Sequence, residues 1–309
     1  MEIIIITPRS LSNGDHPLLK KLRDVGYQLV FPSPGRQPTE KELVAVIGDA
    51  VGYVAGVEPI TAATLSAASK LRVISRNGTG IDNIDVEAAA QRHIIIRKAD
   101  GANARGVAEL AVGLMIAAAR GIPASDRNLK AERWKRSQGF ELEGKTLGII
   151  GVGKIGKLVA GFALAFGMKV LAYDAYPDRG FVPSPDFSFV ALEELLKRAD
   201  IVTLHCPPLP DRKPLISKAQ MATMRHGVII INTARQSLVD EAALVRNLDS
   251  GAVAWYAIDG FDREPPEDFS LAKHERVIVT PHIGGFTAES VERAAEVAID
   301  NLLDTLRKA

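Results

Sequence analysis

The sequence predicts an α/β protein built from two Rossmann-like or flavodoxin-like domains with parallel sheets. Short β-branched runs alternate with amphipathic segments along the whole chain, which is typical of parallel strands joined by helices. With 309 residues, the chain is long for a single hydrophobic core, so two domains are expected. A glycine-rich turn from Gly151 to Gly156 follows one strand-like run and opens a helix-like segment.

The expected elements of the first half are strand 2–7, helix 17–25, strand 27–31, helix 39–48, strand 51–55, helix 61–69, strand 71–75, helix 85–92 and strand 94–97. A long helix is expected from about 103 to 120, followed by an irregular charged stretch at 126–136. The second half should contain strand 146–150, helix 154–166, strand 169–173, helix 191–198, strand 201–204, helix 217–224, strand 227–232, helix 240–248, strands 253–258 and 277–280, and a terminal helix 288–307.

Composition and charge argue against several classes of protein. Hydrophobic residues make up 47% of the chain, enough for substantial cores. The 38 Lys and Arg balance 37 Asp and Glu without forming a basic cluster, so nucleic acid is not an expected partner. The run Ile3 to Ile6 is too short for a signal peptide, and the apolar stretch 107–119 is too short for a bilayer, so no membrane contact is expected. Because Cys206 is the only cysteine, no intrachain disulfide can form, and a cytoplasmic location is expected.

The glycine-rich turn has the context of a dinucleotide site. Gly151 permits a tight turn, Gly153 lets a pyrophosphate approach the backbone, and Gly156 allows close packing of helix on sheet. Asp174 ends the next strand and can bind both hydroxyls of an adenosine ribose while repelling a 2′-phosphate. No Arg or Lys follows it at 175–177, so the pattern predicts NAD rather than NADP. The alternative is a tight strand–helix turn with a surface aspartate.

Three polar residues follow three predicted strands of the second half. Arg235 comes after strand 227–232, Glu264 lies in the loop after strand 253–258, and His282 comes after strand 277–280. In open parallel sheets, ligands bind beyond the carboxyl ends of the strands. We therefore expect these side chains to converge near the nicotinamide end of the dinucleotide.

Their chemistry suits the reduction of a 2-oxo acid. A guanidinium can hold the carboxylate, a histidine can transfer the proton near neutral pH, and a glutamate on the other ring nitrogen can fix the tautomer. Singly, each has a structural explanation: Arg235 could cap a loop, and Glu264 lies in the acidic stretch 262–268. No cluster has the spacing of metal ligands, so no metal is expected. Four other histidines are interpreted as non-functional: His16, His93, His226 and His274.

Further motifs extend this pattern over nearly the whole chain. They are the segment 76–85 (RNGTGIDNID), Val107-Ala108-Glu109, His205-Cys206-Pro207, Asn232 to Arg235, Asp259 to Pro265, and Thr280-Pro281-His282. Together with the glycine turn and Asp174, they resemble the D-isomer-specific 2-hydroxyacid dehydrogenase family, which includes phosphoglycerate dehydrogenase.

The resemblance implies a role for each matching residue. His282 would be the acid/base, Glu264 its partner and Arg235 the carboxylate anchor, while Asp259 would hold the nicotinamide carboxamide and Cys206 would be no nucleophile. The implied cofactor-binding residues are Gly151, Gly153, Lys154, Ile155, Gly156, Asp174, Cys206, Pro207, Thr233, Ala234, Arg235, Asp259, His282, Gly284 and Gly285. The implied substrate-binding residues are Arg76, Asn77, Gly78, Thr79, Arg235 and His282, with backbone N–H groups of Gly78 and Thr79 offered to the carboxylate.

The resemblance also implies how the chain is organised. Residues 1–100 and 284–309 would form the substrate domain, and 101–283 the NAD-binding domain, with the two closing over the substrate. The segment of about 103–140 would form much of a homodimer interface. Because the sequence ends soon after the last expected helix, no appended regulatory domain is expected.

The substrate remains open at this point. Arg76 matches a position that contacts substrate phosphate in phosphoglycerate dehydrogenases, so 3-phosphoglycerate is a candidate, although Arg76 could equally be a solvated strand-end arginine. Phosphite oxidation and a dinucleotide-sensing corepressor-like role remain alternatives. Formate dehydrogenases carry glutamine at the position of Glu264, which argues against formate oxidation. The exact substrate is not assigned, because several residues depart from the family pattern: Asp100, Leu209, Arg212, Gln236 and Gly260.

Overall fold

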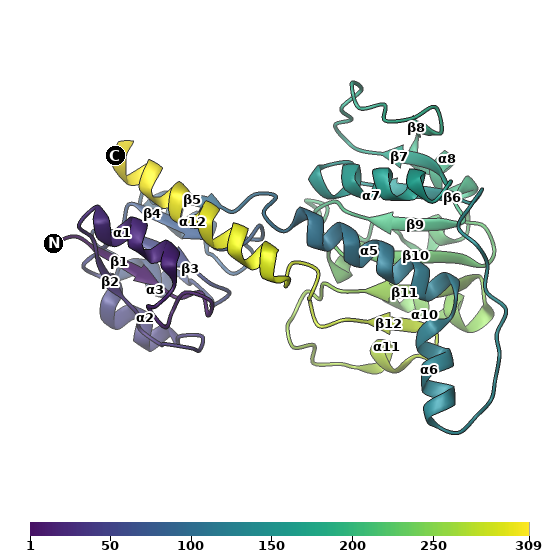
Figure 1. Cartoon of the computed structure of the whole chain (residues 1–309), viewed down its shortest axis with the longest axis horizontal. Helices are drawn as coiled ribbons and strands as arrows, with labels where there is room; N and C mark the ends of the chain where they lie inside the picture. The colour runs from purple at the N-terminus through teal and green to yellow at the C-terminus, as the bar shows by residue number, and fades with distance from the viewer. Residues whose placement is uncertain (309) are drawn as a thin grey trace. The chain divides into compact units, whose positions relative to one another are not determined.

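A computed structural model describes residues 1–308, and the chain divides into two compact units (Figure 1). Unit 1 comprises Met1–Asn103 and the segment from Thr287 onward, and unit 2 comprises Ala104–Phe286. Unit 1 is therefore discontinuous, and unit 2 is inserted into it. Each unit is a parallel sheet covered by helices, so the predicted fold class is confirmed.

The sheet of unit 1 contains five parallel strands in the order β2-β1-β3-β4-β5. Their bounds are β1 Ile3–Ile6, β2 Gln28–Val30, β3 Ala50–Ala55, β4 Val73–Arg76 and β5 Ile95–Lys98. Alternate residues of β1 point to opposite faces, as the pleat of a strand requires. Ile4 and Ile6 pack with residues of the helices η1 (Pro17–Leu19), α1 (Lys20–Asp24) and α12 (Ala288–Lys308), while Ile5 packs with residues of α2 (Glu40–Ile47), α3 (Ala62–Ser66) and α4 (Val86–Gln91).

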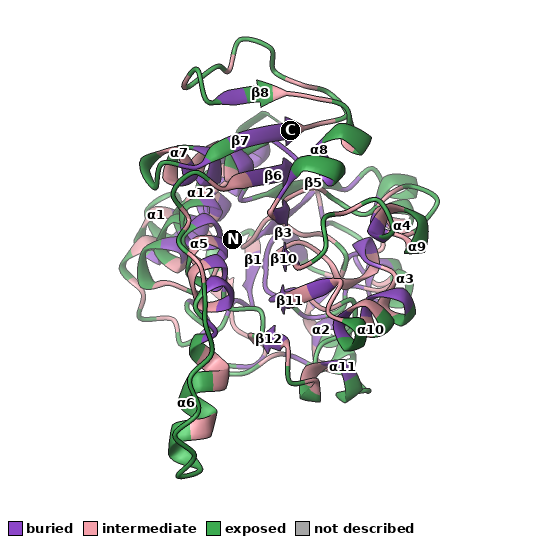
Figure 2. Cartoon of the chain, turned by 90° about the vertical axis from the view of Figure 1, so that its right-hand side faces the viewer, coloured by how far each residue is buried: buried purple, intermediate pink, exposed green. Residues whose placement is uncertain are grey.

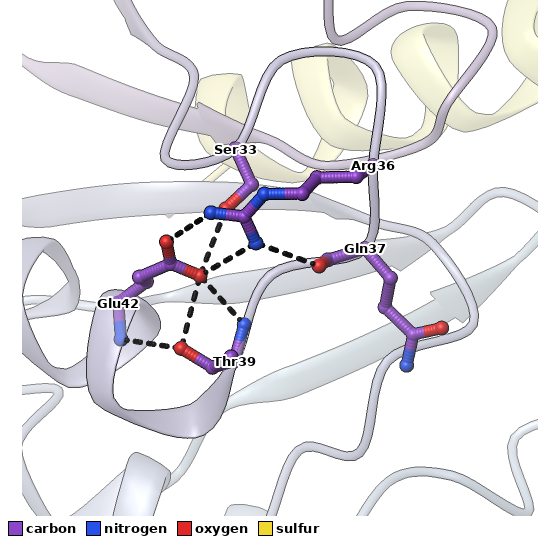
Figure 3. Close-up of polar contacts among 5 residues, drawn as sticks. All are labelled: Ser33, Arg36, Gln37, Thr39 and Glu42. Carbon is purple, nitrogen blue, oxygen red and sulfur yellow. Dashed lines mark hydrogen bonds and ion pairs between the residues drawn. The ribbon is translucent and has the colours of Figure 1, made fainter.

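Helix α2 begins at a capping box (Figure 3). The Thr39 side chain accepts a hydrogen bond from the Glu42 N–H, and the Glu42 carboxylate accepts one from the Thr39 N–H at 2.9 Å. Each side chain thus satisfies a backbone N–H that the first turn of a helix leaves without a partner. Arg36 adds an ion pair with the same carboxylate, and its guanidinium is the principal reason why the pKa of Glu42 lies well below its usual range.

The sheet of unit 2 contains seven parallel strands in the order β12-β11-β10-β9-β6-β7-β8. Their bounds are β6 Thr146–Ile150, β7 Lys169–Tyr173, β8 Phe187–Phe189, β9 Ile201–Leu204, β10 Val228–Asn232, β11 Val253–Ile258 and β12 Val277–Val279. The chain runs outward from β6 through β7 and β8, then returns to β9 and runs outward in the other direction. The order reverses between β6 and β9, the point at which doubly wound sheets bind ligands.

Helices cover both faces of this sheet (Figure 1). One face packs against α5 (Ala104–Ala119) and α7 (Lys154–Ala165), both rich in small buried residues. The other face packs against α8 (Leu192–Arg198), α9 (Lys218–Met221), α10 (Glu241–Ser250) and α11 (Ser270–Lys273). Tyr256 and Leu244 are among the residues buried on that side.

Four short elements differ from expectation. Helix α6 (Ile122–Lys130) occupies part of the stretch expected to be irregular, and β8, α11 and the 3-10 helix η2 (Gln236–Leu238) were not expected. Helix α6 buries none of its residues (Figure 2), and its charged residues from Asp126 onward were interpreted as an irregular stretch. Within residues 1–308, no single helix is long and apolar enough to cross a bilayer; only α5 and α6 taken together, bent by 62°, pass that test.

Candidate active site

The three residues expected to carry the chemistry lie at one edge of the unit 2 sheet. Arg235 follows β10, Glu264 lies in the loop after β11, and His282 lies three residues beyond β12. These strands are neighbours in the sheet and run parallel, so their carboxyl ends share an edge. Local sequence places each residue just past a buried apolar run, where the backbone leaves the sheet and polar side chains can reach solvent.

His282 and Glu264 form a hydrogen-bonded pair. The His282 Nδ1 lies 2.7 Å from Glu264 Oε1, and the two side chains are 46% and 40% exposed. The N–H of Phe261 donates to the same carboxylate oxygen at 3.2 Å, which helps to hold Glu264 in place. A carboxylate on Nδ1 orients the ring and leaves Nε2 as the nitrogen that can exchange a proton with a ligand.

Asp259 anchors the loop that carries His282. Its buried carboxylate accepts hydrogen bonds from the Thr280 hydroxyl at 2.7 Å, the Ile283 N–H at 2.8 Å and the Gly284 N–H at 2.9 Å. His282 itself has a φ of +53°, a left-handed conformation that costs a non-glycine residue about 1–2 kcal/mol. The three hydrogen bonds that Asp259 accepts stabilise that conformation, a positioning role that the sequence reasoning missed.

Asn232 shapes the turn that carries Arg235. Its buried side-chain amide donates to the Arg235 carbonyl at 2.8 Å and accepts from the Ala234 N–H at 3.0 Å. The Arg235 Nη1 donates to the Ala234 carbonyl at 2.9 Å. A Cβ at Gly260 would lie 2.3 Å from that same carbonyl oxygen, so this chain's glycine at 260 makes room for the turn. The turn is thus held by residues from two strands.

The glycine turn fits a dinucleotide. A Cβ at Gly151 would lie 2.7 Å from the Cys206 backbone nitrogen, and one at Gly156 would lie 2.1 Å from the Gly151 carbonyl oxygen. At Gly153, by contrast, a Cβ would meet nothing within 4 Å, so the backbone there is open to a phosphate. Gly153 caps α7 without a side-chain hydrogen bond, which leaves the helix N-terminus available to an anion.

Asp174 ends β7 beside this turn. Its carboxylate accepts hydrogen bonds from the Val152 N–H at 2.7 Å and from the Tyr176 N–H at 2.8 Å. It therefore braces the glycine turn, and a carboxylate with about four acceptor positions can also receive ribose hydroxyls. The two roles are compatible because both use the carboxylate oxygens as acceptors.

His205 and Cys206 follow β9, on the far side of the switch point. The His205 ring lies 2.9 Å from the Thr203 hydroxyl through Nε2 and 3.3 Å from the Thr233 hydroxyl through Nδ1. Burial lowers the pKa of His205 to about 3, so the ring is neutral at physiological pH. Burial also raises the pKa of Cys206 to about 11, which keeps it a thiol and makes it a poor nucleophile.

The expected substrate-binding segment, Arg76 to Thr79, begins at the last residue of β4 in unit 1. Arg76 is only 9% exposed, so it is not a solvated strand-end arginine. The Gly78 N–H donates to the Arg76 carbonyl at 2.9 Å, so this donor is used within the loop. The expectation of a backbone donor therefore depends on Thr79.

Comparisons with known proteins identify the family. Residues 112–284 match the model described as D-isomer specific 2-hydroxyacid dehydrogenase, NAD binding domain. The D-3-phosphoglycerate dehydrogenase of Methanocaldococcus jannaschii is 43% identical over 273 residues, which cover 87% of this chain and 52% of that protein. The chain belongs to the D-isomer specific 2-hydroxyacid dehydrogenase family, although it spans about half the length of the curated relatives it matches.

Solved structures agree with this assignment. A glyoxylate reductase from Paecilomyes thermophila has a TM-score of 0.84 and 28% identity, covering 99% of this chain and 96% of its own. The NAD+-bound 3-phosphoglycerate dehydrogenase of Entamoeba histolytica has a TM-score of 0.80 and 28% identity, covering 99% of this chain and 95% of its own.

Among residues 1–308, no group of three or more His, Cys, Asp or Glu could hold a metal ion.

Proposed function

We propose that this chain is an NAD-dependent dehydrogenase that interconverts a small polar 2-oxo acid and its D-2-hydroxy acid. The observation that carries the proposal is the hydrogen-bonded His282–Glu264 pair, which lies on the sheet edge that also carries Arg235. The glycine turn and Asp174 lie at the same carboxyl edge of the sheet, across the switch point. Family membership supports the same chemistry.

NAD would be held by residues at the carboxyl ends of β6, β7, β9 and β10, and when bound it supplies or accepts the hydride. Gly153 and the N-terminus of α7, with Lys154 and Ile155, would receive the pyrophosphate, and Asp174 the adenosine ribose. The backbone of Cys206 and Pro207 would flank the adenosine. Thr233 and Ala234 would lie along the nicotinamide half, with Asp259 and the Gly284–Gly285 turn near its carboxamide.

The catalytic roles follow from the charges and from the pair's geometry. Arg235 would bind the substrate carboxylate through its planar guanidinium. His282 would transfer a proton between Nε2 and the substrate oxygen at C2, while Glu264 on Nδ1 stabilises the imidazolium and fixes the ring's orientation. Asp259 would keep His282 at the required position through the loop it anchors.

The remaining roles concern the two units, the pairing of chains and the location of the protein. Unit 1 would be the substrate domain, in which Arg76, Asn77, Gly78 and Thr79 form the loop that contacts the acid. Unit 2 would be the NAD-binding domain. The segment of about 103–140 would pair two copies of the chain, because Ile122, Leu129 and Trp134 on it are 51%, 59% and 81% exposed. A cytoplasmic location stays a prediction from the single cysteine.

Steady-state kinetics of NADH oxidation with 2-oxo acids tests the proposal. His282→Ala should lower turnover on the order of a hundredfold or more while NADH binding is largely retained. Glu264→Gln should lower turnover less, because its amide can still bond to Nδ1 but carries no charge. His226→Ala is the matched control, since this histidine is exposed in the same unit, and it should keep wild-type turnover. Undiminished turnover by His282→Ala would contradict the assignment of the proton donor.

A further inference from the structure

The loop that carries Glu264 follows β11, which is the strand between β10 and β12 in the sheet. The loop therefore has the turn that carries Arg235 on one side and the loop that carries His282 on the other. Residues 262–265 are exposed, and within the described chain no N–H from 260 to 268 donates to a backbone carbonyl. The position of the Glu264 carboxylate thus depends on the side-chain contacts of this loop.

On one side, the loop is tied to the residues that follow β12. The Asp259 carboxylate accepts hydrogen bonds from the Ile283 and Gly284 N–H groups at 2.8 Å and 2.9 Å, which fixes the base of the loop. Further along the loop, Glu264 Oε1 lies 2.7 Å from His282 Nδ1. Both side chains of this pair are partly exposed, so water competes for the hydrogen bond between them. The bond therefore persists only if the carboxylate is held in place by the rest of the loop.

On the other side, the loop contacts the turn after β10 through Ser237. The Ser237 hydroxyl donates to Asp262 Oδ1 at 3.1 Å, and Asp262 stands two residues before Glu264. The residue after Ser237 is Leu238, which is fully buried and whose N–H donates to the Arg235 carbonyl at 3.2 Å. Ser237 is therefore a donor on a firmly held turn, whereas its acceptor belongs to the exposed part of the loop.

Contacts with other elements hold the turn independently of the loop. Gln236, one of the residues that depart from the family pattern, donates from Nε2 to Glu241 Oε2 at 2.7 Å, in the first turn of α10. The Leu238 carbonyl accepts a hydrogen bond from the Ile216 N–H at 2.9 Å. Because the turn is fixed in this way, the hydrogen bond from Ser237 transmits the position of the turn to the loop.

The other ion pair of the loop cannot do the same. Arg263 and Glu267 pair at 2.6 Å, but both residues belong to the loop and their side chains are 73% and 71% exposed. Such exposed pairs contribute little to stability, and this one attaches the loop to nothing outside it. The hydrogen bond between Ser237 and Asp262, by contrast, joins segments that are 25 positions apart in the sequence.

We propose that Ser237 is a positioning residue for proton transfer: through Asp262 it holds the loop after β11 so that the Glu264 carboxylate stays on His282 Nδ1. The inference rests on the proposed function and adds a residue to it. In this role Ser237 acts on the carboxylate and does not bind the cofactor. Loss of its hydroxyl should therefore lower turnover without lowering the affinity for NADH.

The first test is the turnover number of the full chain with NADH and the 2-oxo acid that the wild type reduces fastest. Ser237→Ala should lower kcat about fivefold, the effect of one hydrogen bond, while the Kd for NADH stays unchanged. Ser237→Thr keeps a hydroxyl and should recover most of the wild-type kcat. Ser250→Ala is the matched control, because it removes an exposed serine hydroxyl that donates to a backbone carbonyl near the amino end of β11, and it should keep the wild-type kcat.

The second test asks whether Ser237 acts through the two carboxylates. Asp262→Ala should lower kcat as much as Ser237→Ala, and the double variant should be no slower than either single variant, because both remove the same hydrogen bond. In a Glu264→Ala background, Ser237→Ala should lower kcat no further, since no carboxylate remains to be positioned. A residue with a merely structural role would lower kcat in that background as well.

The outcomes separate this inference from the proposed function. An unchanged kcat in Ser237→Ala, or an equal loss with and without the Glu264 carboxylate, overturns the role of Ser237 but leaves the dehydrogenase intact. A wild type that reduces no 2-oxo acid overturns the proposed function and this inference with it. If Ser237→Ala fails to fold, as judged by circular dichroism and NADH binding, Asp262→Ala with and without Glu264→Ala decides by the same comparison.

Discussion

The neutral His205 imidazole should make the stability of unit 2 depend on pH. Burial lowers its pKa in the folded protein from 6.5 to about 3, whereas the unfolded chain takes up the proton near 6.5. Below pH 6.5 the unfolded state therefore binds more protons than the folded state at this site, and stability falls with pH. The contribution of His205 is complete above pH 6.5 and is lost progressively as the pH approaches 3.

The size of the effect follows from the two pKa values. Between pH 7.5 and pH 5.0, protonation of the unfolded imidazole alone stabilises the unfolded state by about 2 kcal/mol. The pKa of His205 in the folded protein has little influence on this free energy, because at pH 5.0 the folded imidazole is still almost wholly neutral.

Tryptophan fluorescence during urea unfolding measures this loss selectively. Both tryptophans, Trp134 and Trp255, belong to unit 2, so the signal reports on that unit. The wild type should lose about 2 kcal/mol more than His205→Gln between pH 7.5 and pH 5.0. His226→Gln, at an exposed position of the same unit, should behave like the wild type. An equal loss of stability in acid by the wild type and by His205→Gln would refute a neutral imidazole at this position.

Three further predictions concern the cofactor turn, the thiol and the N-terminal unit. Asp174→Ala removes the acceptor for the Val152 and Tyr176 N–H groups, so the affinity for NADH should fall at least about tenfold and the preference for NADH over NADPH should narrow. An unaltered ratio of the two affinities in fluorescence titrations would count against Asp174 as the ribose ligand. In the folded protein, Cys206 should react with iodoacetamide at pH 7.5 at least tenfold more slowly than in the unfolded protein, because burial raises its pKa to about 11. Equal rates in the two states would show an exposed thiolate. The lowered pKa of Glu42 contributes stability that is present above its ordinary value of 4.5 and is lost as the pH falls below it. Glu42→Gln should therefore lower the fall of the melting temperature with decreasing pH, measured by circular dichroism. An unchanged fall would argue against the Arg36 ion pair.

All strands except β8, and the sheet edge that carries the candidate site, could be predicted because they depend on local patterns. Runs such as Val228–Asn232 are apolar and β-branched over their full length, which indicates a strand buried on both faces. Polar residues just beyond such runs must lie at the carboxyl edge of a parallel sheet. The positions of Arg235 and His282 at that edge followed from this reasoning alone.

Other features depend on contacts between distant segments and leave little trace in the sequence. Helix α6 buries none of its residues, and its charged residues were interpreted as an irregular stretch. Asp259 was expected only to bind the cofactor, because its bonds to the His282 loop come from residues more than 20 positions away. Glu58 was not singled out in the sequence, and only tertiary packing reveals that it is buried. Burial of a polar residue after a strand is set by what folds over it.

The central claim, hydride transfer from NADH to C2 of a 2-oxo acid, is tested most directly by following the hydrogen itself. The full chain is incubated with NADH carrying deuterium at C4 of the nicotinamide and with hydroxypyruvate, and the product is examined by NMR and chiral chromatography. Our account predicts D-glycerate with deuterium at C2, formed far more slowly by His282→Ala. Product without deuterium, L-glycerate, or equal rates in the two proteins would contradict it.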